Sequence, residues 1–343
     1  MMLSDKFFCG DSRVCTLRRH VPAPLFRHSF NMSKIPAQME VTLCGLGVYD
    51  LFINGKRITK GYLAPYRSNP DHIVYYDKYD VAPYICAGEN VVALALGNGI
   101  MSSEMPVWGA DKYPWRGAPR FALAAEADGE FLFDGSVFLT SGGEVTFNDW
   151  HCTESIDARL VKEGWNDRGF DDSSWEKVVP AQAPAGEKKI CTADPVRAYD
   201  RKKPVKTWRG ERGYIFDFGI SGAGTYNLKI TGESGQRIEV YTADCVAEGK
   251  KITNRNLYCW SLSDEMAGMV QHDFLTLSGR RDEFEPRFTF RGFRYAEITG
   301  ITQEQARSLE IEFILFSNSF ASAGSFLCDD ETINRLQQCV LNS

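Results

Sequence analysis

The sequence contains no uninterrupted apolar run of the roughly 18 residues that a membrane helix needs. Its first ten residues carry Asp5 and Lys6, where a signal peptide would have a long apolar stretch. An excess of basic residues is also missing, because 39 Lys and Arg stand against 45 Asp and Glu for a net charge of -6. No general basic field is therefore available for nucleic acid. We expect a cytoplasmic protein that has no membrane and no nucleic acid as a partner.

Paired cysteines are absent as well. The ten cysteines are scattered singly and none forms a C-x-x-C pair, so neither a zinc site nor a disulfide framework is indicated. Some, such as Cys44, lie in apolar stretches. A free cysteine in such a stretch acts as a small buried hydrophobic residue in a reducing compartment. We expect the cysteines to be reduced.

The common catalytic signatures are also missing. The sequence has no G-x-S-x-G, no G-x-x-x-x-G-K-[ST] and no H-E-x-x-H. The histidines are isolated from one another at His20, His28, His72, His151 and His272. Spacing selects no pair among the 45 acids that would face each other across a glycosidase cleft. The residues alone therefore give no support for catalysis within this chain.

Short β-like runs separated by turns are what the sequence does contain. Its 343 residues suggest two domains or three. The segment 39–56 is rich in β-forming residues and ends its first strand at Asn54-Gly55, a strong hairpin signal. The segment 91–96 reads as a buried strand, and 121–127 as a strand followed by a turn. Seven or more such strands without an intervening helical pattern predict a β-sandwich.

A second set of strands follows a break in this pattern. Residues 149–180 read as a loop, and 180–204 collect Pro, Ala and Lys without periodicity, as a domain boundary does. Further strands are predicted at 213–219, 225–230, 237–241, 288–299 and 309–316. Asp329 or Asp330 can cap a final helix with Ile333, Leu336 and Val340 on one face. A helix of about a dozen residues is marginal alone, so this face needs a partner.

These patterns predict an all-β fold of two consecutive antiparallel β-sandwich domains, jelly-roll-like, with a short C-terminal helix. The expected divisions are an N-terminal extension over 1–23, the first sandwich over 24–190, the second over 191–322, and a linker with the helix over 323–343.

Two loops have the composition of a carbohydrate site. The first holds Trp108, Tyr113 and Trp115 beside Asp111 and Arg116, which offer flat rings for a sugar face and charged groups for its hydroxyls. The predicted sugar-binding residues are Tyr66, Asn69, Trp108, Asp111, Trp115 and Arg116.

The second loop, 64–71, supplies oxygen atoms that could hold calcium if the two loops meet. Asp71 and Asn98 are the predicted calcium ligands. The same rings and acids also fit a structural role, in which the rings anchor the loops and the acids are solvated. The polar set Glu154, Asp157 and Arg159 has the same two interpretations.

Several blocks in order resemble a known family. The blocks 45–56, 79–81, 96–99, 156–159 with 164–166, and 170–175 look like the N-terminal domain of bacterial α-L-rhamnosidases. The blocks 216–219, 223–224 and 285–295 resemble the sandwich that follows in those enzymes, and 324–336 looks like the entry to their catalytic helical barrel. The resemblance spans roughly residues 24 to 343, and the order of the blocks makes it more specific than any one of them.

The resemblance implies an absence as well as a function. The enzymes of this family are inverting glycosidases whose acid and base residues lie in an α/α barrel. The resemblance of this chain to them extends only as far as the first helix of that barrel. No catalytic residue is therefore carried over, and we expect no hydrolysis by this chain alone. A related N-terminal sandwich binds L-rhamnose through calcium, which favours the two loops as a site. Gly99-Ile-Met departs from the family, which usually has an aromatic pair there.

Three hypotheses follow. In the first, the chain is the non-catalytic N-terminal region of an α-L-rhamnosidase-like glycoside hydrolase, supports the barrel and binds rhamnose-containing glycans. Its open surface would then favour a homo-oligomer. In the second, it is a free-standing lectin-like protein. In the third, both sandwiches are purely structural.

Overall fold

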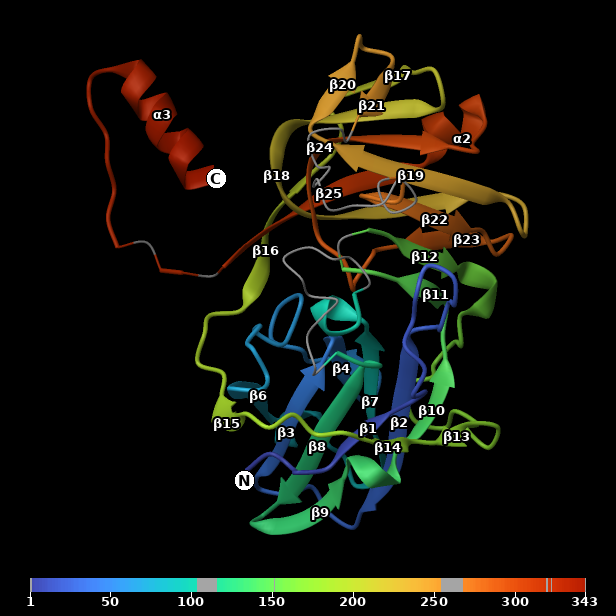
Figure 1. Ribbon diagram of the computed structural model, residues 1–343, viewed down its shortest axis with the longest axis vertical. Coiled ribbons are helices and arrows are strands. Elements are labelled where there is room, and N and C mark those ends of the chain that lie inside the picture. The colour runs from blue at the N-terminus through green and yellow to red at the C-terminus, as the bar shows by residue number, and fades with distance from the viewer. Residues whose placement is uncertain are drawn as a thin grey trace.

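A computed structural model describes residues 2–103, 116–150, 152–253, 268–318, 320–321 and 323–342. Two β-rich bodies lie one above the other along the long axis, with the N-terminus in the lower one (Figure 1). The predicted all-β fold is confirmed. Within the described ranges, no helix has both the length and the apolar character to cross a membrane.

The lower body is a sandwich of two sheets. One sheet has the strand order β14-β1-β8-β3-β6-β15 with β9 added to β8, and the other has the order β13-β10-β2-β7-β4-β5. The strands of the first sheet are β1 (Phe7–Cys9), β3 (Met39–Leu46), β6 (Ile73–Asp80), β8 (Arg120–Ala127), β9 (Glu130–Asp134), β14 (Val179–Ala181) and β15 (Glu187–Ile190). Those of the second are β2 (Pro24–Met32), β4 (Val48–Ile53), β5 (Lys56–Arg57), β7 (Gly88–Gly97), β10 (Leu139–Gly142) and β13 (Glu176–Lys177).

The core of this sandwich forms where the apolar faces of the two sheets meet. Leu51 and Leu94 from one sheet pack with Phe121 and Leu123 from the other. β7 is buried from Asn90 onwards, as its continuous apolar run predicts. The predicted hairpin is confirmed, since β4 and β5 pair across Asn54 and Gly55, whose φ angles of 47° and 80° are those an Asn-Gly turn allows.

The upper body is built on a ten-stranded sheet with the order β11-β12-β22-β19-β24-β18-β25-β16, to which β17 and β23 are joined through β18. Its strands are β11 (Val145–Asn148), β12 (Glu154–Asp157), β16 (Val196–Lys202), β17 (Lys206–Arg209), β18 (Tyr214–Thr231), β19 (Arg237–Ala243), β22 (His272–Thr276), β23 (Arg281–Phe284), β24 (Arg291–Thr299) and β25 (Glu310–Asn318). A separate hairpin pairs β20 (Cys245–Ala247) with β21 (Lys251–Thr253).

β18 organises this sheet. Its first part pairs with β17 and β24, and its second part pairs with β25 and β23. Figure 1 shows how strongly it curves. The sequence predicted two strands here, at 213–219 and 225–230, but the structure has one of 18 residues. The predicted strand over 288–299 begins at Arg291 instead of Phe288.

The two bodies share strands and core. β12 pairs in parallel with β22, with Ser155 opposite Phe274 and Ile156 opposite Leu275, so residues before 158 enter the upper sheet. One apolar cluster contains both Val48 of the lower sandwich and Phe216 of the upper one. The interpretation of 149–180 as a loop was wrong at β12, because a strand of only four residues leaves too short an alternation to recognise.

Four single-turn 3-10 helices and two α-helices complete the described elements. The short turns are η1 (Ala82–Tyr84), η2 (Gly99–Met101), η4 (Gly135–Val137) and η5 (Ala158–Leu160), and the α-helices are α2 (Gln303–Ser308) and α3 (Glu331–Asn342).

α3 confirms the predicted C-terminal helix, and Oδ1 of Asp330 accepts hydrogen bonds from the backbone N–H groups of Thr332 and Ile333. It stands away from both bodies in Figure 1, and the side chains of Ile333 and Leu336 are exposed.

Candidate functional site

A groove with a volume of about 380 Å³ opens where the two bodies meet. One wall is the segment Leu63 to Arg67 with Trp150. The other wall consists of residues from the upper body, namely Val196, Ala223, Phe290, Phe316, Ser317 and Asn318. Residues from both halves of the chain therefore contribute to one concave surface, which is where ligand sites tend to form.

Backbone contacts hold the loop of the first wall against the upper body. The N–H of Tyr62 donates to the carbonyl of Val196 at 2.8 Å, and the Tyr62 ring packs on Phe316 with 4.3 Å between centroids. Gly61 precedes this contact with a φ of +74°, and a Cβ there would lie 2.1 Å from the Val196 carbonyl oxygen. Only glycine fits so close an approach at this φ.

The groove combines exposed rings with a cation. Tyr66 is 53% exposed and Phe290 37% exposed, and the buried Trp150 ring lies 5.2 Å from that of Phe290. The guanidinium of Arg67 lies 4.3 Å above the Trp150 ring. Desolvation by this packing lowers the pKa of Arg67 from its ordinary value, but an arginine stays charged in proteins. Rings for a sugar face beside donors for its hydroxyls are the chemistry of carbohydrate recognition.

A second pocket, of about 340 Å³, lies in the lower body. Asp71 and Arg116 line it together with Cys9, Arg120 and the segment 180–185. The strands β14, β1 and β8 are neighbours in the sheet, with Cys9 opposite both Val179 and Arg120, so the register brings these residues together.

The predicted site residues separate into three places. Tyr66 is on the groove, whereas Asp71 and Arg116 are in the second pocket. Oδ1 of Asn69, an exposed loop residue, accepts a hydrogen bond from the N–H of Asp71 at 3.0 Å. Asn98 is buried, and its side-chain amide donates to the Asn148 carbonyl at 2.6 Å.

The predicted residues Trp108, Asp111 and Trp115 lie outside the described residues, as does Tyr113. The described ranges hold no group of three or more His, Cys, Asp or Glu residues that could bind a metal ion. The sugar-binding set and the calcium ligands Asp71 and Asn98 therefore stay predictions.

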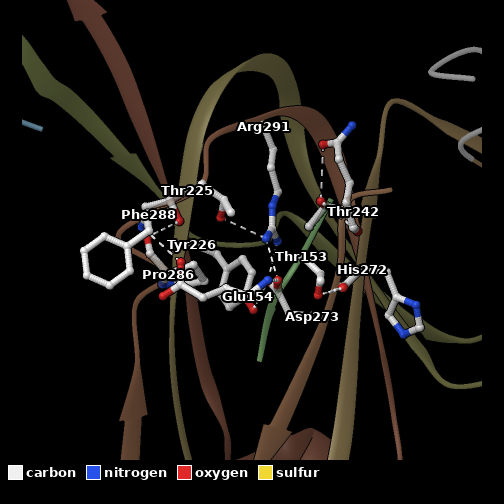
Figure 2. A network of polar contacts seen from close by, with 12 residues as sticks. Thr153, Glu154, Thr225, Tyr226, Thr242, His272, Asp273, Pro286, Phe288 and Arg291 are labelled. Atoms are coloured by element: carbon white, nitrogen blue, oxygen red, sulfur yellow. Dashed lines mark hydrogen bonds and ion pairs between the residues drawn. The ribbon is translucent and has the colours of Figure 1, made fainter. Parts of the chain in front are cut away.

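A buried polar network fixes the junction beneath the groove. Figure 2 shows the side chains of Asp273 and Arg291 directed toward one another, and the side chain of Glu154 extending toward Phe288. Asp273 is fully buried, forms an ion pair with Arg291, and accepts hydrogen bonds from the Tyr226 hydroxyl at 2.7 Å and from the Glu154 backbone N–H at 2.7 Å. β12 is thereby attached to β22 and β24, next to Phe290.

Glu154 completes this attachment from the lower body. Its carboxylate accepts hydrogen bonds from the backbone N–H groups of Arg287 at 3.2 Å and Phe288 at 3.0 Å. Burial raises the pKa of Glu154 to about 7, against the opposing effect of these hydrogen bonds. Burial would also lower the pKa of Arg291, but the Asp273 carboxylate outweighs it and holds that pKa above its ordinary value.

Sequence reasoning did not identify Trp150, Phe290 or the Arg291 network as parts of a site. The burial of Arg291 could have been predicted, because it lies two residues before the core residue Phe293 and alternate residues of a strand face the same side of the sheet. Trp150 and Phe290 had no such signal, because they meet only through the fold.

Family comparisons cover both bodies. Residues 34–200 match the family model described as the Alpha-L-rhamnosidase N-terminal domain. Residues 208–315 match that of the Bacterial alpha-L-rhamnosidase concanavalin-like domain. Together the two matched ranges occupy most of the chain.

Individual relatives agree. The chain is 30% identical over 329 residues to an alpha-L-rhamnosidase of Formosa agariphila, covering 92% of this chain and 34% of that protein. The solved alpha-L-rhamnosidase of Dictyoglumus thermophilum superimposes with a TM-score of 0.82 at 30% identity, over 98% of this chain and 38% of that one. That of Streptomyces avermitilis, complexed with L-rhamnose, gives 0.82 at 25% identity, over 94% and 31%. The chain thus spans about a third of the length of these relatives.

Proposed function

The chain belongs to the bacterial alpha-L-rhamnosidase family, and we propose that it is the non-catalytic N-terminal region of an α-L-rhamnosidase-like glycoside hydrolase. In this proposal, hydrolysis of terminal α-L-rhamnosyl residues is an activity of the whole enzyme. The two sandwiches support the catalytic barrel and bind rhamnose-containing glycan.

One observation carries the proposal. The two matched domains follow one another in order, while the chain spans 34% of the Formosa agariphila relative. The remaining length of such relatives offers room for a catalytic domain. The shared core and the buried network between the two bodies support the role of a rigid platform.

The groove at the junction is the proposed rhamnosyl site. L-Rhamnose is a 6-deoxy sugar, so one end carries a methyl group and its ring carries hydroxyls. The exposed rings of Tyr66 and Phe290 suit the methyl group and the C–H face, and Arg67 suits the hydroxyls. The complex of the Streptomyces avermitilis relative with L-rhamnose supports this choice of sugar.

Calorimetric titration of the chain with L-rhamnose tests the site, first with calcium and then with a chelator. Tyr66→Ala and Phe290→Ala should each weaken binding about fivefold or more, because each removes a ring that faces the sugar. Tyr199→Ala is the matched control, since Tyr199 is 55% exposed on β16 and does not line the groove. Absence of heat with and without calcium, or equal binding by all variants, would rule out this site.

The non-catalytic role has a separate test. The purified chain should release no rhamnose from a chromogenic α-L-rhamnoside at any concentration of the chain. Steady release that scales with the amount of chain would contradict the proposal, whatever the titration gives.

A further inference from the structure

The groove at the junction contains a single charged side chain. Of the described residues that line it, Arg67 alone carries a charge. The other polar side chains of the lining belong to Tyr66, Ser317 and Asn318, which are uncharged and exposed. L-Rhamnose is uncharged too, so a rhamnosyl unit alone gives no reason for a cation at this place.

Arg67 has no ionic partner among the described residues. The ion pairs and hydrogen bonds within them include none that its guanidinium forms. Desolvation lowers the pKa of Arg67, which is the direction expected for a cation without a carboxylate beside it. The residue is nonetheless exposed and lines the groove, so a ligand in the groove can reach it.

The ring of Trp150 holds this guanidinium in place. The central carbon of the guanidinium lies 4.3 Å from the centroid of that ring, and Trp150 is itself buried against Phe290. Stacking occupies the flat face of a guanidinium and leaves the N–H donors in its plane available for hydrogen bonds. A side chain held in this way also loses less conformational entropy when a ligand binds.

The loop that carries Arg67 is anchored on both sides of it. The Ala64 carbonyl accepts a hydrogen bond from the N–H of Tyr49 at 2.9 Å. The Ser68 hydroxyl donates to the carbonyl of Ile73 at 2.6 Å. Arg67 is therefore positioned at the groove before a ligand arrives.

The free energy of covering this cation depends on the ligand. A neutral sugar over Arg67 would take water away from the charge without compensating it. A carboxylate would compensate it and accept two parallel N–H bonds from the guanidinium. The groove volume of about 380 Å³ lies within the range of sites for ligands larger than a monosaccharide, so a second sugar unit can bring that carboxylate.

On the basis of the proposed rhamnosyl site, we propose that the groove selects glycans in which the rhamnosyl unit is linked to a uronic acid, whose carboxylate binds the guanidinium of Arg67. A carboxylate occupies only some of the guanidinium donors and leaves the others for rhamnosyl hydroxyls. The side chains of Tyr66, Ser317 and Asn318 are available to the remaining hydroxyls of the two units. The module would thus recognise an acidic glycan in preference to a neutral rhamnoside.

Calorimetric titration of the full chain with two disaccharides provides the test. One is L-rhamnose linked to D-glucuronate, and the other has D-glucose in place of the glucuronate, so the two differ by the carboxylate. The glucuronate disaccharide should bind about tenfold more tightly or better, and its affinity should fall as sodium chloride is raised. Equal affinities would overturn the proposal. Inorganic sulfate binding as tightly as the glucuronate disaccharide would overturn the assignment to a sugar.

Variants of Arg67 locate the effect. Arg67→Gln keeps hydrogen-bond donors but removes the charge, so the preference for glucuronate should disappear. Arg67→Lys keeps the charge but not the flat, two-bond donor, so it should retain only part of the preference. Arg209→Gln is the matched control, because Arg209 is exposed, lies 4.9 Å from the centroid of the Tyr214 ring and does not line the groove. Because Arg67 is exposed and has no described ion pair to lose, both of its variants should unfold at the temperature of the parent chain. A preference that survives in both would contradict the proposal.

The outcomes also separate this proposal from the proposed function. Tyr66→Ala and Phe290→Ala should weaken both disaccharides by similar factors and leave the preference between them intact. Binding of L-rhamnose together with equal binding of the two disaccharides would refute the role of Arg67 alone. A preference for glucuronate that Arg67→Gln abolishes, without any effect of the two ring variants, would support this role while ruling out the rhamnosyl site.

Discussion

Arg291 and Asp273 form their ion pair where water has no access, with exposed fractions of 3% and 0%. Removing one partner of such a pair leaves an uncompensated buried charge. Arg291→Gln should therefore lower the free energy of unfolding by about 3 to 5 kcal/mol, as measured by urea denaturation.

The control is an exposed pair of the same kind. Arg281 and Glu310 lie 2.5 Å apart with both side chains largely exposed. Arg281→Gln should cost less than about 1 kcal/mol, because solvent screens such pairs. Equal costs for the two variants would mean that the buried network does not stabilise the junction.

Glu154 predicts a pH dependence with a defined sign. Its pKa is raised from 4.5 to about 7 by burial, so between these values the folded protein holds a proton that the unfolded chain has released. Stability should therefore fall as pH rises through this window and become flat above it. A shift of this size corresponds to about 3 kcal/mol.

The measurement compares unfolding free energies of the protein and of Glu154→Gln at pH 5 and pH 8. The difference between the two proteins isolates the contribution of Glu154 from the contributions of other groups. Two charged neighbours act on Glu154 itself: Asp273 raises its pKa and Arg287 lowers it. A protein that becomes more stable relative to Glu154→Gln as pH rises would refute the assignment.

Sequence alone gave part of the candidate site at this scale. Tyr66 was predicted from its loop, and the structure places it on the groove. Two other rings of the groove, Trp150 and Phe290, are about 84 and 224 residues away from it in the chain, and no local pattern joins positions so distant. Contacts between side chains that are distant in sequence depend on the tertiary structure. A single sequence shows only which residues are apolar and with what period, and not which of them meet.

Among the elements, β18 depends most on small residues. Gly224 lies opposite Leu315 of β25, and a Cβ at Gly224 would lie 1.9 Å from the carbonyl oxygen of Ile314. Gly224→Ala must therefore displace one of the two strands. We expect a loss of about 1 to 3 kcal/mol in the free energy of unfolding, as for other overpacked sites.

Gly292→Ala is the matched control, because Gly292 lies on the neighbouring strand β24 and a Cβ there meets nothing within 4 Å. It should change stability by no more than about 0.5 kcal/mol. A Gly224→Ala variant as stable as this control would show that β18 and β25 have freedom to separate.

Strand prediction succeeded where one strong local signal was sufficient. The turn at Asn54-Gly55 and the apolar run of β7 were identified because each depends on neighbours in sequence. It failed for the continuity of β18, since the three glycines at 219, 222 and 224 look like breaks. In the structure, Gly222 and Gly224 lie inside β18 and allow close approach of β25.

For the whole molecule, the shared sheet and core predict cooperative unfolding. β11 and β12 belong to the upper sheet although β13, β14 and β15 of the lower sandwich follow them in the chain, and one apolar cluster contains residues of both bodies. Scanning calorimetry of the chain should give one transition, with equal calorimetric and van't Hoff enthalpies.

Residues 191–322 expressed alone supply the comparison. This piece lacks β11 and β12 and the hydrogen bonds of Glu154 to Arg287 and Phe288, so it should unfold at a lower temperature than the whole chain. Two resolved transitions in the whole chain, one of them at the temperature of this piece, would contradict the expected coupling.

The parallel pairing of β12 with β22 also has a consequence for synthesis on the ribosome. Glu154 and its partner Asp273 are separated by 119 positions, and translation adds roughly 5 to 20 residues each second. β12 therefore emerges on the order of ten seconds before the strand that completes its pairing. During that interval its edge is open to other chains, so the nascent protein should depend most on chaperones before residue 276 has left the exit tunnel.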